Sequence, residues 1–234
     1  MLTETLRRKM LKIQFRDDGK IEAGVDEVGR GCLWGPLVTG AVIWPAESSW
    51  TEKLRELAPQ IKDSKKISEK KRKVIATKIN ELALATGIGV VEASDIDAIG
   101  ITKANQTAFA RAVTNLKVKP GRLLVDGTIP LLYDDWKDEQ YSIVDGDAEY
   151  LPIAAASIIA KVYRDTWVEE WCSQNKPLGE DYSLVSSKGY GTAAHRRAIQ
   201  EKGILPLHRR LFLRKMFGEQ IYKPSHQCFI EDDN

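Results

Sequence analysis

Apolar and polar positions divide the chain into short strand-like runs and longer helix-like runs. Apolar runs that alternate or continue over a few residues, bounded by glycine, proline or charged residues, predict β-strands. Apolar residues recurring at spacings of three and four predict helices. The predicted strands are residues 21–25, 36–44, 87–94, 122–127 and 141–147. The predicted helices are residues 3–14, 69–84, 102–116, 153–172, 192–203 and 208–216.

The order of these elements predicts the fold class. Strands come first and then alternate with helices, which favours a mixed sheet covered by helices in a single α/β domain with a small helical C-terminal addition. Ser68 is placed to cap the helix over 69–84, whose apolar side chains share one face: Val74, Ile75, Ile79 and Leu82. The alanine-rich residues 154–160 predict a helix that packs closely against the sheet.

Composition indicates a folded globular protein. The chain has 234 residues, of which 43% are hydrophobic and 29% are charged, enough for a sizeable core. No apolar run approaches the roughly 20 residues of a membrane helix, and the first residues lack a secretory core, so we expect a cytoplasmic protein. The cysteines lack the paired spacing of zinc or redox motifs, which predicts reduced thiols at Cys32, Cys172 and Cys228.

Charge is segregated along the chain although the net charge is only +2. Residues 62–73 carry seven Lys or Arg against two acids, and residues 188–215 carry eight against one. Residues 134–149 carry seven acids against one lysine. Basic surfaces near an acidic centre suit a polyanion held over bound metal ions, although such charge runs also fit ordinary solvated helix faces.

Acidic residues follow three of the predicted strands. Asp26 and Glu27 end the first, Asp126 ends the fourth, and Asp145 or Asp147 ends the fifth. Ligand sites gather at strand ends in α/β sheets, and several carboxylates in one place require a compensating cation. Because no histidine or cysteine lies near them, the site would take Mg²⁺ or Mn²⁺. Two such ions about 4 Å apart are a common arrangement for phosphoryl transfer.

Two objections accompany this interpretation. An aspartate before glycine is also an ordinary turn residue, as in VDGT and VDGD. Neighbouring residues of a regular strand point to opposite faces, so Asp26 and Glu27 share a site only if the backbone leaves strand geometry there. Gly29 and Gly31 would offer that freedom.

Four motifs, in this order along the chain, resemble the type 2 ribonucleases H, and specifically the bacterial ribonuclease HII family. They are GVDEVGRGCLWGPLVTGAVI (24–43), DSKKISEKKR (63–72), LLVDG (123–127) with GDAEYLPIAAASIIAKVYRD (146–165), and SKGYGTAAHRRAIQEKGILPLHRRLF (187–212). The resemblance covers roughly residues 21–212. It implies a ribonuclease H-like fold, with a five-stranded mixed sheet flanked by helices and a helical C-terminal part that closes over the substrate.

The resemblance also implies an activity. We expect an endonuclease that hydrolyses the RNA strand of RNA–DNA hybrids by two-metal-ion catalysis with Mg²⁺ or Mn²⁺. It would nick on the 5′ side of single ribonucleotides embedded in duplex DNA, leaving 3′-hydroxyl and 5′-phosphate ends. The catalytic, metal-binding acids of the family would fall on Asp26, Glu27, Asp126 and Asp147. The family acid precedes the small residue that leads into the alanine-rich helix, which favours Asp147 over Asp145. Asp165, beside Arg164, is assigned to a structural ion pair.

Substrate-binding positions follow from the same resemblance. A Gly-Arg-Gly loop brings backbone groups near a 2′-hydroxyl, which distinguishes RNA from DNA. In the family this loop and the tyrosine of the GYGT motif read the ribonucleotide at the RNA-to-DNA junction, which points to Gly29, Arg30, Gly31 and Tyr190. Candidate phosphate contacts are Ser64, Lys65 and Lys188. His195 and His208 are assigned to phosphate contact or packing, not to metal binding.

Two other functions compete with this prediction. One is another two-metal nuclease or strand-transfer enzyme of the same fold, against which the GRG loop and the GYGT motif both argue. The other is a catalytically silent nucleic-acid-binding module, which retention of four acids disfavours. We expect a helical N-terminal extension over 1–20, a catalytic domain over 21–212 and a tail over 213–234. The expected partner is an RNA–DNA hybrid or a ribonucleotide-containing duplex, bound by a monomer, and the sequence does not decide whether the protein docks to a replication or transcription partner.

Overall fold

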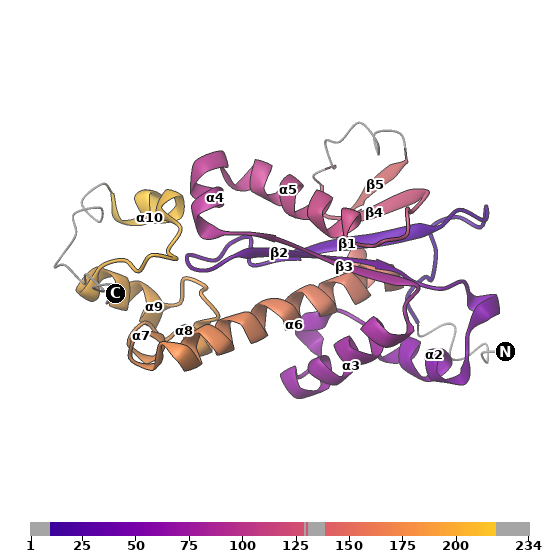
Figure 1. The fold of residues 1–234 in the computed structure, drawn as a ribbon, viewed down its shortest axis with the longest axis horizontal. Coiled ribbons are helices and arrows are strands. Elements are labelled where there is room, and N and C mark those ends of the chain that lie inside the picture. The colour runs from indigo at the N-terminus through magenta and orange to yellow at the C-terminus, as the bar shows by residue number, and fades with distance from the viewer. Residues whose placement is uncertain (1–9, 129, 131–138, 219–234) are drawn as a thin grey trace, which may run out of the picture.

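A five-stranded mixed sheet forms the centre of the computed structural model, which describes residues 10–128, 130 and 139–218 (Figure 1). Its strand order is β3-β2-β1-β4-β5. Neighbours among β1, β2 and β3 pair antiparallel, whereas β4 is parallel to β1 and β5 is parallel to β4. The predicted fold class is therefore confirmed. The strands are β1 Glu22–Val28, β2 Leu37–Ile43, β3 Ala85–Val91, β4 Arg122–Asp126 and β5 Gln140–Ile143.

Helices cover both faces of the sheet. Figure 1 shows α4 and α5 on one face, α6 with α3 and α2 on the other, and the short helices α7 to α10 beyond one end of the sheet. The helices are α2 Glu52–Leu57, α3 Glu69–Leu82, α4 Ala93–Ile99, α5 Ile101–Thr114, α6 Leu151–Gln174, α7 Lys176–Asp181, α8 Leu184–Ser187, α9 Ala193–Lys202 and α10 Arg210–Phe217. Single 3₁₀ turns are η1 Glu47–Ser49, η2 Ala58–Gln60, η3 Ser64–Lys66 and η5 Gly146–Ala148.

Helix α6 packs directly on the backbone of β1 and β2. A Cβ atom at Gly24 would lie 2.2 Å from the carbonyl carbon of Pro152, and one at Gly40 would lie 2.3 Å from the carbonyl oxygen of Ala156. The two glycines therefore let the helix approach more closely than any side chain would permit. Four alanines of α6 fill this contact and are fully buried, as predicted: Ala154, Ala155, Ala156 and Ala160.

The buried face of α3 differs from the predicted one. Ile75 and Ile79 are buried, but Val74 is 53% exposed. These two isoleucines lie four residues apart and pack into the cluster below α6, so the preceding residue is turned about 100° away from it. Ser68 does occupy the N-cap position of α3, although its side chain makes no capping hydrogen bond there.

The N-terminal segment is not helical where the structure describes it. Residues 10–14 of the predicted helix over 3–14 carry only an isolated bridge between Lys12 and Tyr150, and the preceding part lies outside the described residues. The peptide N–H of Lys12 donates to Glu149, and Leu151 donates to the Lys12 carbonyl. Phe15 then packs on Tyr141, with ring centroids 4.5 Å apart. Pairing across the start of α6 thus outweighs local helix propensity.

The C-terminal helix continues past the predicted domain boundary at residue 212. Helix α10 ends at Phe217, and Leu213 within it is fully buried in the cluster beneath α7 to α10. Cys32 and Cys172 are buried free thiols, and Cys228 lies outside the described residues. None of the helices in the described part of the chain has the length and apolar character needed to cross a membrane.

Candidate metal and nucleic-acid site

Three carboxylates meet on the face of the sheet that α6 covers. Asp26 of β1 pairs with Gly40, whose backbone touches α6. Asp126 ends β4 two residues after Leu124, which packs toward the start of α6. Asp147 lies in η5, just before α6, and its backbone N–H donates to Asp126 Oδ1 at 3.4 Å. Segments far apart in the sequence therefore bring these acids together.

Glu27 reaches the same region without the predicted break in the strand. The backbone stays in β1 through Val28, and Glu27 pairs regularly with Thr39 of β2, so the predicted departure from strand geometry is wrong. On its other edge β1 pairs with β4 only as far as Val25. Burial raises the Glu27 pKa, the charge of Arg30 lowers it, and the nearby Asp126 carboxylate raises it further, which places Glu27 within electrostatic reach of Asp126.

Asp26 carries the strongest evidence that the acids form one site. Its side chain is only 6% exposed, and burial raises its pKa well above the usual value. The charges of Asp126 and Glu27, and more weakly Asp147, raise the pKa further, whereas a hydrogen bond from Ser157 opposes the shift. The other three predicted acids are therefore close enough to Asp26 to repel its carboxylate.

The other acids show the same pattern. Burial raises the pKa of Asp147, and the neighbouring carboxylates of Asp126 and Asp63 raise it further. Burial also raises the pKa of Asp126, although backbone N–H groups of Asp147 and Gly146 favour its charged form. Lys65 lowers the pKa of both Asp126 and Asp147 and is the cation that offsets part of the repulsion.

The donor set fits a hard divalent cation. Every candidate ligand is a carboxylate oxygen, as Mg²⁺ and Mn²⁺ prefer. In the described parts of the chain, no three His, Cys, Asp or Glu side chains already form a closed set of metal ligands.

Two further acids take different positions. Asp145 is exposed and adopts a left-handed conformation with φ of 53°, and its charge raises the pKa of both Asp126 and Asp147. Asp165 is buried and forms ion pairs, but with Lys161 at 2.7 Å and Arg72 at 3.7 Å, not with the adjacent arginine. Through its ion pair with Arg72, Asp165 thus joins α6 to α3.

In the loop over residues 29–31, which follows β1, only one of the two glycines occupies a position that requires glycine. Gly29 has φ of 83°, and a Cβ atom there would lie 2.3 Å from Nε of Arg164. Gly31 has neither constraint, because its φ is ordinary and a Cβ atom would meet open space. The Arg30 guanidinium is exposed and lies 3.9 Å from the Glu27 carboxylate. Gly29 is therefore needed for loop shape, whereas Gly31 leaves room beside it.

Two buried arginines, which the sequence analysis missed, hold this loop. Arg209 Nη1 donates to the carbonyl oxygens of Gly29 and Arg30, and its Nε donates to Gly35 at 2.9 Å. Arg164 donates to Trp34, Pro36 and Lys188. Burial lowers the pKa of Arg209 to about 10. No local sequence pattern distinguishes either arginine, because Arg164 is followed by Asp165 and Arg209 lies between His208 and Arg210.

Tyr190 lies beside the same loop. Its side chain is 39% exposed, and Lys161 Nζ and Arg164 Cζ each lie 5.9 Å from its ring centroid. Burial of the phenol, together with the nearby Cys32 thiol, raises the pKa of Tyr190 to about 12. The phenol is therefore neutral near pH 7 and presents part of its ring to solvent.

The predicted phosphate contacts lie in different surroundings. Ser64 is buried, and its hydroxyl lies 3.2 Å from that of Ser157 beneath the acid cluster. Lys65 follows it in η3 and is exposed near the acids. The Lys188 ammonium donates to Glu169 at 2.6 Å and is mostly buried, so it is already paired within the protein.

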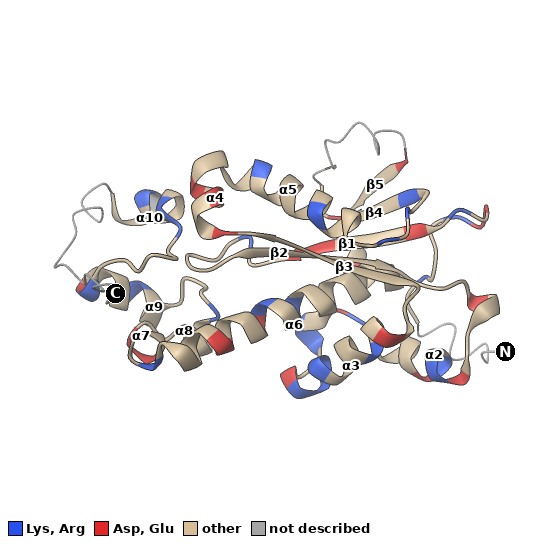
Figure 2. Cartoon of the chain, viewed as in Figure 1, with Lys and Arg blue, Asp and Glu red and all other residues tan. Residues whose placement is uncertain are grey.

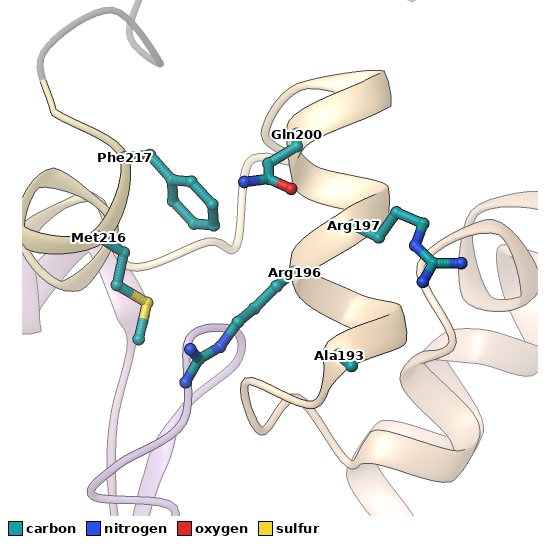
Figure 3. A pocket seen from close by; sticks show the side chains of 6 residues that line it. All are labelled: Ala193, Arg196, Arg197, Gln200, Met216 and Phe217. Atoms are coloured by element: carbon teal, nitrogen blue, oxygen red, sulfur yellow. The ribbon is translucent and has the colours of Figure 1, made fainter.

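Lys65 and Arg30 lie near the acid cluster, and further Lys and Arg residues occur on the C-terminal helices. Figure 2 shows Lys and Arg along α3, α6, α9 and α10. A cavity of about 490 Å³ lies at α9 and α10 and is lined by residues that include Arg196 and Arg197. Figure 3 shows Arg196 and Gln200 on the side of α9 that faces Met216 and Phe217, whereas Arg197 points away from them. His195 and His208, in contrast, are buried and hydrogen-bonded to each other.

Carboxylates at the ends of β1 and β4, on a five-stranded mixed sheet covered by helices, define a metal-dependent nuclease of the ribonuclease H-like class. The family model described as Ribonuclease HII matches residues 23–217, so the chain belongs to the ribonuclease HII family. The ribonuclease HII of Parabacteroides distasonis is 40% identical over 200 residues, covering 86% of this chain and 94% of that relative.

Solved structures agree with this assignment. The crystal structure of ribonuclease H2 from Pyrococcus horikoshii OT3 has a TM-score of 0.67 and 29% identity, covering 86% of this chain and 99% of that one. The ribonuclease HII of Archaeoglobus fulgidus, solved in complex with PCNA, has a TM-score of 0.65 and 26% identity, covering 88% and 98%.

Family membership fixes the broad activity. Members are divalent-metal-dependent endonucleases that act on RNA–DNA hybrids, and the chain is accordingly a ribonuclease H. This sets aside the silent binding module and the other two-metal nucleases or strand-transfer enzymes of the same fold that were considered from the sequence. The individual roles of the candidate site residues stay predictions.

Proposed function

We propose that this enzyme nicks duplex DNA on the 5′ side of a single embedded ribonucleotide, in addition to hydrolysing the RNA strand of hybrids. The products would carry 3′-hydroxyl and 5′-phosphate ends. The observation that carries the proposal is the meeting of Asp26, Asp126 and Asp147 beside a loop that buried arginines hold in place. Chemistry and selection of the sugar would then share one end of the sheet.

The acids Asp26, Glu27, Asp126 and Asp147 would hold two Mg²⁺ or Mn²⁺ ions. When bound, these ions would activate the attacking water and stabilise the leaving oxygen. Hydrogen bonds within the chain orient two of these acids: Ser157 hydrogen-bonds to Asp26, and the backbone of η5 hydrogen-bonds to Asp126. Lys65 would balance part of the negative charge of the acids and contact a phosphate of the substrate. Ser64, which precedes Lys65 in the same turn, would also contact that phosphate.

Selection for RNA would come from the loop over 29–31. The carbonyl groups of Gly29 and Arg30 face inward to Arg209. Among the described residues, the peptide N–H groups of Arg30 and Gly31 donate to no other protein group. They are therefore available to a 2′-hydroxyl, which accepts as well as donates hydrogen bonds. The exposed face of Tyr190 would lie against the sugar of the following deoxynucleotide, where a 2′-hydroxyl would crowd it.

Backbone contacts would extend across the C-terminal helices. Arg196 and Arg197 line the cavity between α9 and α10 and suit phosphate groups of a duplex that leaves the acid cluster (Figure 3). Lys188 would contribute once a phosphate replaced Glu169 as its partner. We propose one catalytic unit from residue 21 that extends past 212 to the end of α10, working as a cytoplasmic monomer, and light scattering of the purified protein would test the last point.

A cleavage assay tests this function. Three labelled substrates are compared in Mg²⁺, Mn²⁺ or EDTA: a DNA duplex with one ribonucleotide, the same duplex without it, and an RNA–DNA hybrid. We expect metal-dependent nicking 5′ of the ribonucleotide and no cutting of all-DNA duplex. Ligation and primer extension then identify the ends. Equal cutting of all-DNA duplex, or products with 3′-phosphate ends, would contradict the proposal.

A further inference from the structure

Two buried histidines lie outside the metal chemistry and are unusually close. His195 of α9 and His208, just before α10, are 0% and 2% exposed. Their Nε2 atoms lie 3.0 Å apart, and their ring centroids lie 5.2 Å apart. At that separation one nitrogen must donate and the other accept, so the pair requires a defined arrangement of protons.

The backbone partners fix this arrangement. The peptide N–H of Leu205 donates to His208 Nδ1 at 2.7 Å, so this nitrogen is an acceptor and neutral His208 carries its proton on Nε2. The Nδ1 of His195 lies 2.9 Å from the carbonyl oxygen of Tyr190, which only accepts, so His195 carries its proton on Nδ1. His208 Nε2–H then donates to the bare Nε2 of His195, and every group has a partner.

We propose that His208 and His195 form a positioning relay that fixes the backbone of Tyr190 and thereby sets selectivity for the RNA-to-DNA junction. This inference rests on the proposed function, since it depends on Tyr190 reading the sugar there. Neither histidine touches the substrate in this proposal, and both act through the tyrosine.

The backbone around Tyr190 needs such support. The preceding residues, Lys188 and Gly189, both have positive φ, of 49° and 80°, so no regular element holds this turn. The Tyr190 carbonyl accepts from Thr192 N at 2.8 Å in addition to His195. Without the hydrogen bond from His195, the Tyr190 carbonyl would accept only the local bond from Thr192 N. That single bond within a short turn would hold the Tyr190 backbone only weakly.

Adjacent residues in the sequence serve the two halves of the proposed junction reader. His208 connects through His195 to Tyr190, while Arg209 holds the carbonyls of Gly29 and Arg30. The backbone between them is anchored in turn, because Arg209 N donates to Leu33 O at 2.8 Å. One short segment therefore sets the spacing between the loop and the tyrosine.

The relay requires both imidazoles to be neutral. A second proton on His195 would sit on Nε2 and face the His208 Nε2–H across 3.0 Å. A second proton on His208 would sit on Nδ1 and face the Leu205 N–H across 2.7 Å. The ring of Tyr182 lies 5.6 Å from His208, and the other polar neighbours of the pair are the Leu205 N–H and the Tyr190 carbonyl. Burial, and then the neighbouring His195, lowers the pKa of His208 to about 3, which keeps the pair neutral near pH 7.

Nitrogen-15 NMR of histidine-labelled full-length protein tests the proton arrangement directly. We expect the Nε2–H tautomer for His208 and the Nδ1–H tautomer for His195 at pH 7.5. The opposite tautomer at either ring, or a protonated imidazole there, would overturn the relay. This measurement uses no substrate and is independent of the proposed function.

Paired substitutions test the effect on selectivity. His195→Asn keeps a donor near the Tyr190 carbonyl, whereas His195→Leu removes it; His208→Asn keeps the acceptor for Leu205 but breaks the link between the rings. The readout is the ratio of single-ribonucleotide nicking to hybrid cleavage. Tyr190→Ala serves as the reference for complete loss of the tyrosine side chain that contacts the junction. We expect the ratio to fall about three- to tenfold in His195→Leu, as loss of one hydrogen bond predicts, and less in His195→Asn.

The outcomes separate the two proposals. A wild-type enzyme that nicks single ribonucleotides but shows the same ratio in folded His195→Leu would overturn the relay alone. A wild-type enzyme without such nicking would overturn the proposed function, and the relay's role in selectivity with it. If His195→Leu fails to fold, His208→Asn supplies the comparison, and an unchanged ratio in that variant overturns the relay equally.

Discussion

Arg209 donates a hydrogen bond to the carbonyl oxygen of Gly29 across 2.7 Å, joining residues 180 positions apart in the chain. The guanidinium is fully buried and also donates to Arg30 and Gly35. A C-terminal residue thus determines the shape of the loop that leaves β1 beside the metal-binding acids.

Replacing Arg209 tests that dependence. Arg209→Ala would leave carbonyl oxygens without their buried donor, so we expect a loss of about 2–4 kcal/mol in the free energy of unfolding. Arg209→Lys would keep the positive charge but lose the planar guanidinium with its several N–H donors, so we expect it to recover little of the lost free energy of unfolding. Denaturant unfolding measures both, with the exposed Arg197→Ala as the matched control, expected to stay within about 0.5 kcal/mol of wild type. Comparable losses in Arg197→Ala and Arg209→Ala would contradict this role.

The two loop glycines should respond differently to the same substitution. Gly29→Ala introduces a Cβ atom 2.3 Å from Arg164 Nε at a φ of 83°, so we expect lower stability and loss of cleavage together. Gly31→Ala meets open space and should leave the melting temperature within about 2 °C of wild type. Activity lost in Gly31→Ala would then report contact with substrate, because the loop itself would be intact. A strongly destabilised Gly31→Ala would show that the loop geometry is misassigned.

Asp26 should be unfavourable for folding in the absence of metal. Its raised pKa means that the ionised carboxylate is less stable in the folded protein than in the unfolded chain. In EDTA at pH 7.5 we expect Asp26→Asn to increase the free energy of unfolding, although it abolishes cleavage. Mn²⁺ should stabilise wild type more than the variant. A variant less stable than wild type in EDTA would argue against carboxylate repulsion at this site.

Acid should destabilise the protein through His208. Its pKa is about 3 in the folded protein but near 6.5 in an unfolded chain, so the unfolded state binds the additional proton first as pH falls. Between about pH 6 and pH 4, wild type should therefore lose about 1.4 kcal/mol per pH unit more than His208→Asn. The difference between the two unfolding curves isolates this group from the carboxylates. Parallel pH dependence of the two proteins would mean that His208 is not held neutral.

Local pattern predicted much of the fold because strand and helix periodicities reflect burial on a face. It placed the five strands and the alanine-rich helix, and it put acids at the ends of β1 and β4. It failed at residues 10–14, where pairing with Tyr150 replaces a helix, and at Val74, one position off the buried face of α3. Both errors arise where a distant partner determines the local outcome.

The candidate site divides in the same way. The acids were visible because each lies near the end of a predicted strand, and the family resemblance favoured Asp147 over Asp145. The supporting residues were not visible, because hydrogen bonds from Arg164, Arg209 and His195 to backbone carbonyls follow no sequence spacing. The expected departure from strand geometry at Glu27 is not needed, because β1 continues to Val28 whereas its pairing with β4 ends at Val25.

The most direct test of the metal site compares two aspartates on either side of Gly146. Electron paramagnetic resonance counts Mn²⁺ bound to wild type, Asp147→Asn and Asp145→Asn, without substrate and at equal metal concentration. We expect Asp147→Asn to lose bound Mn²⁺ and Asp145→Asn to retain the wild-type stoichiometry with a modestly weaker affinity, because Asp145 contributes charge but no ligand. Full Mn²⁺ binding by Asp147→Asn, or its loss in Asp145→Asn, would contradict the assignment of Asp26, Glu27, Asp126 and Asp147 as the metal centre.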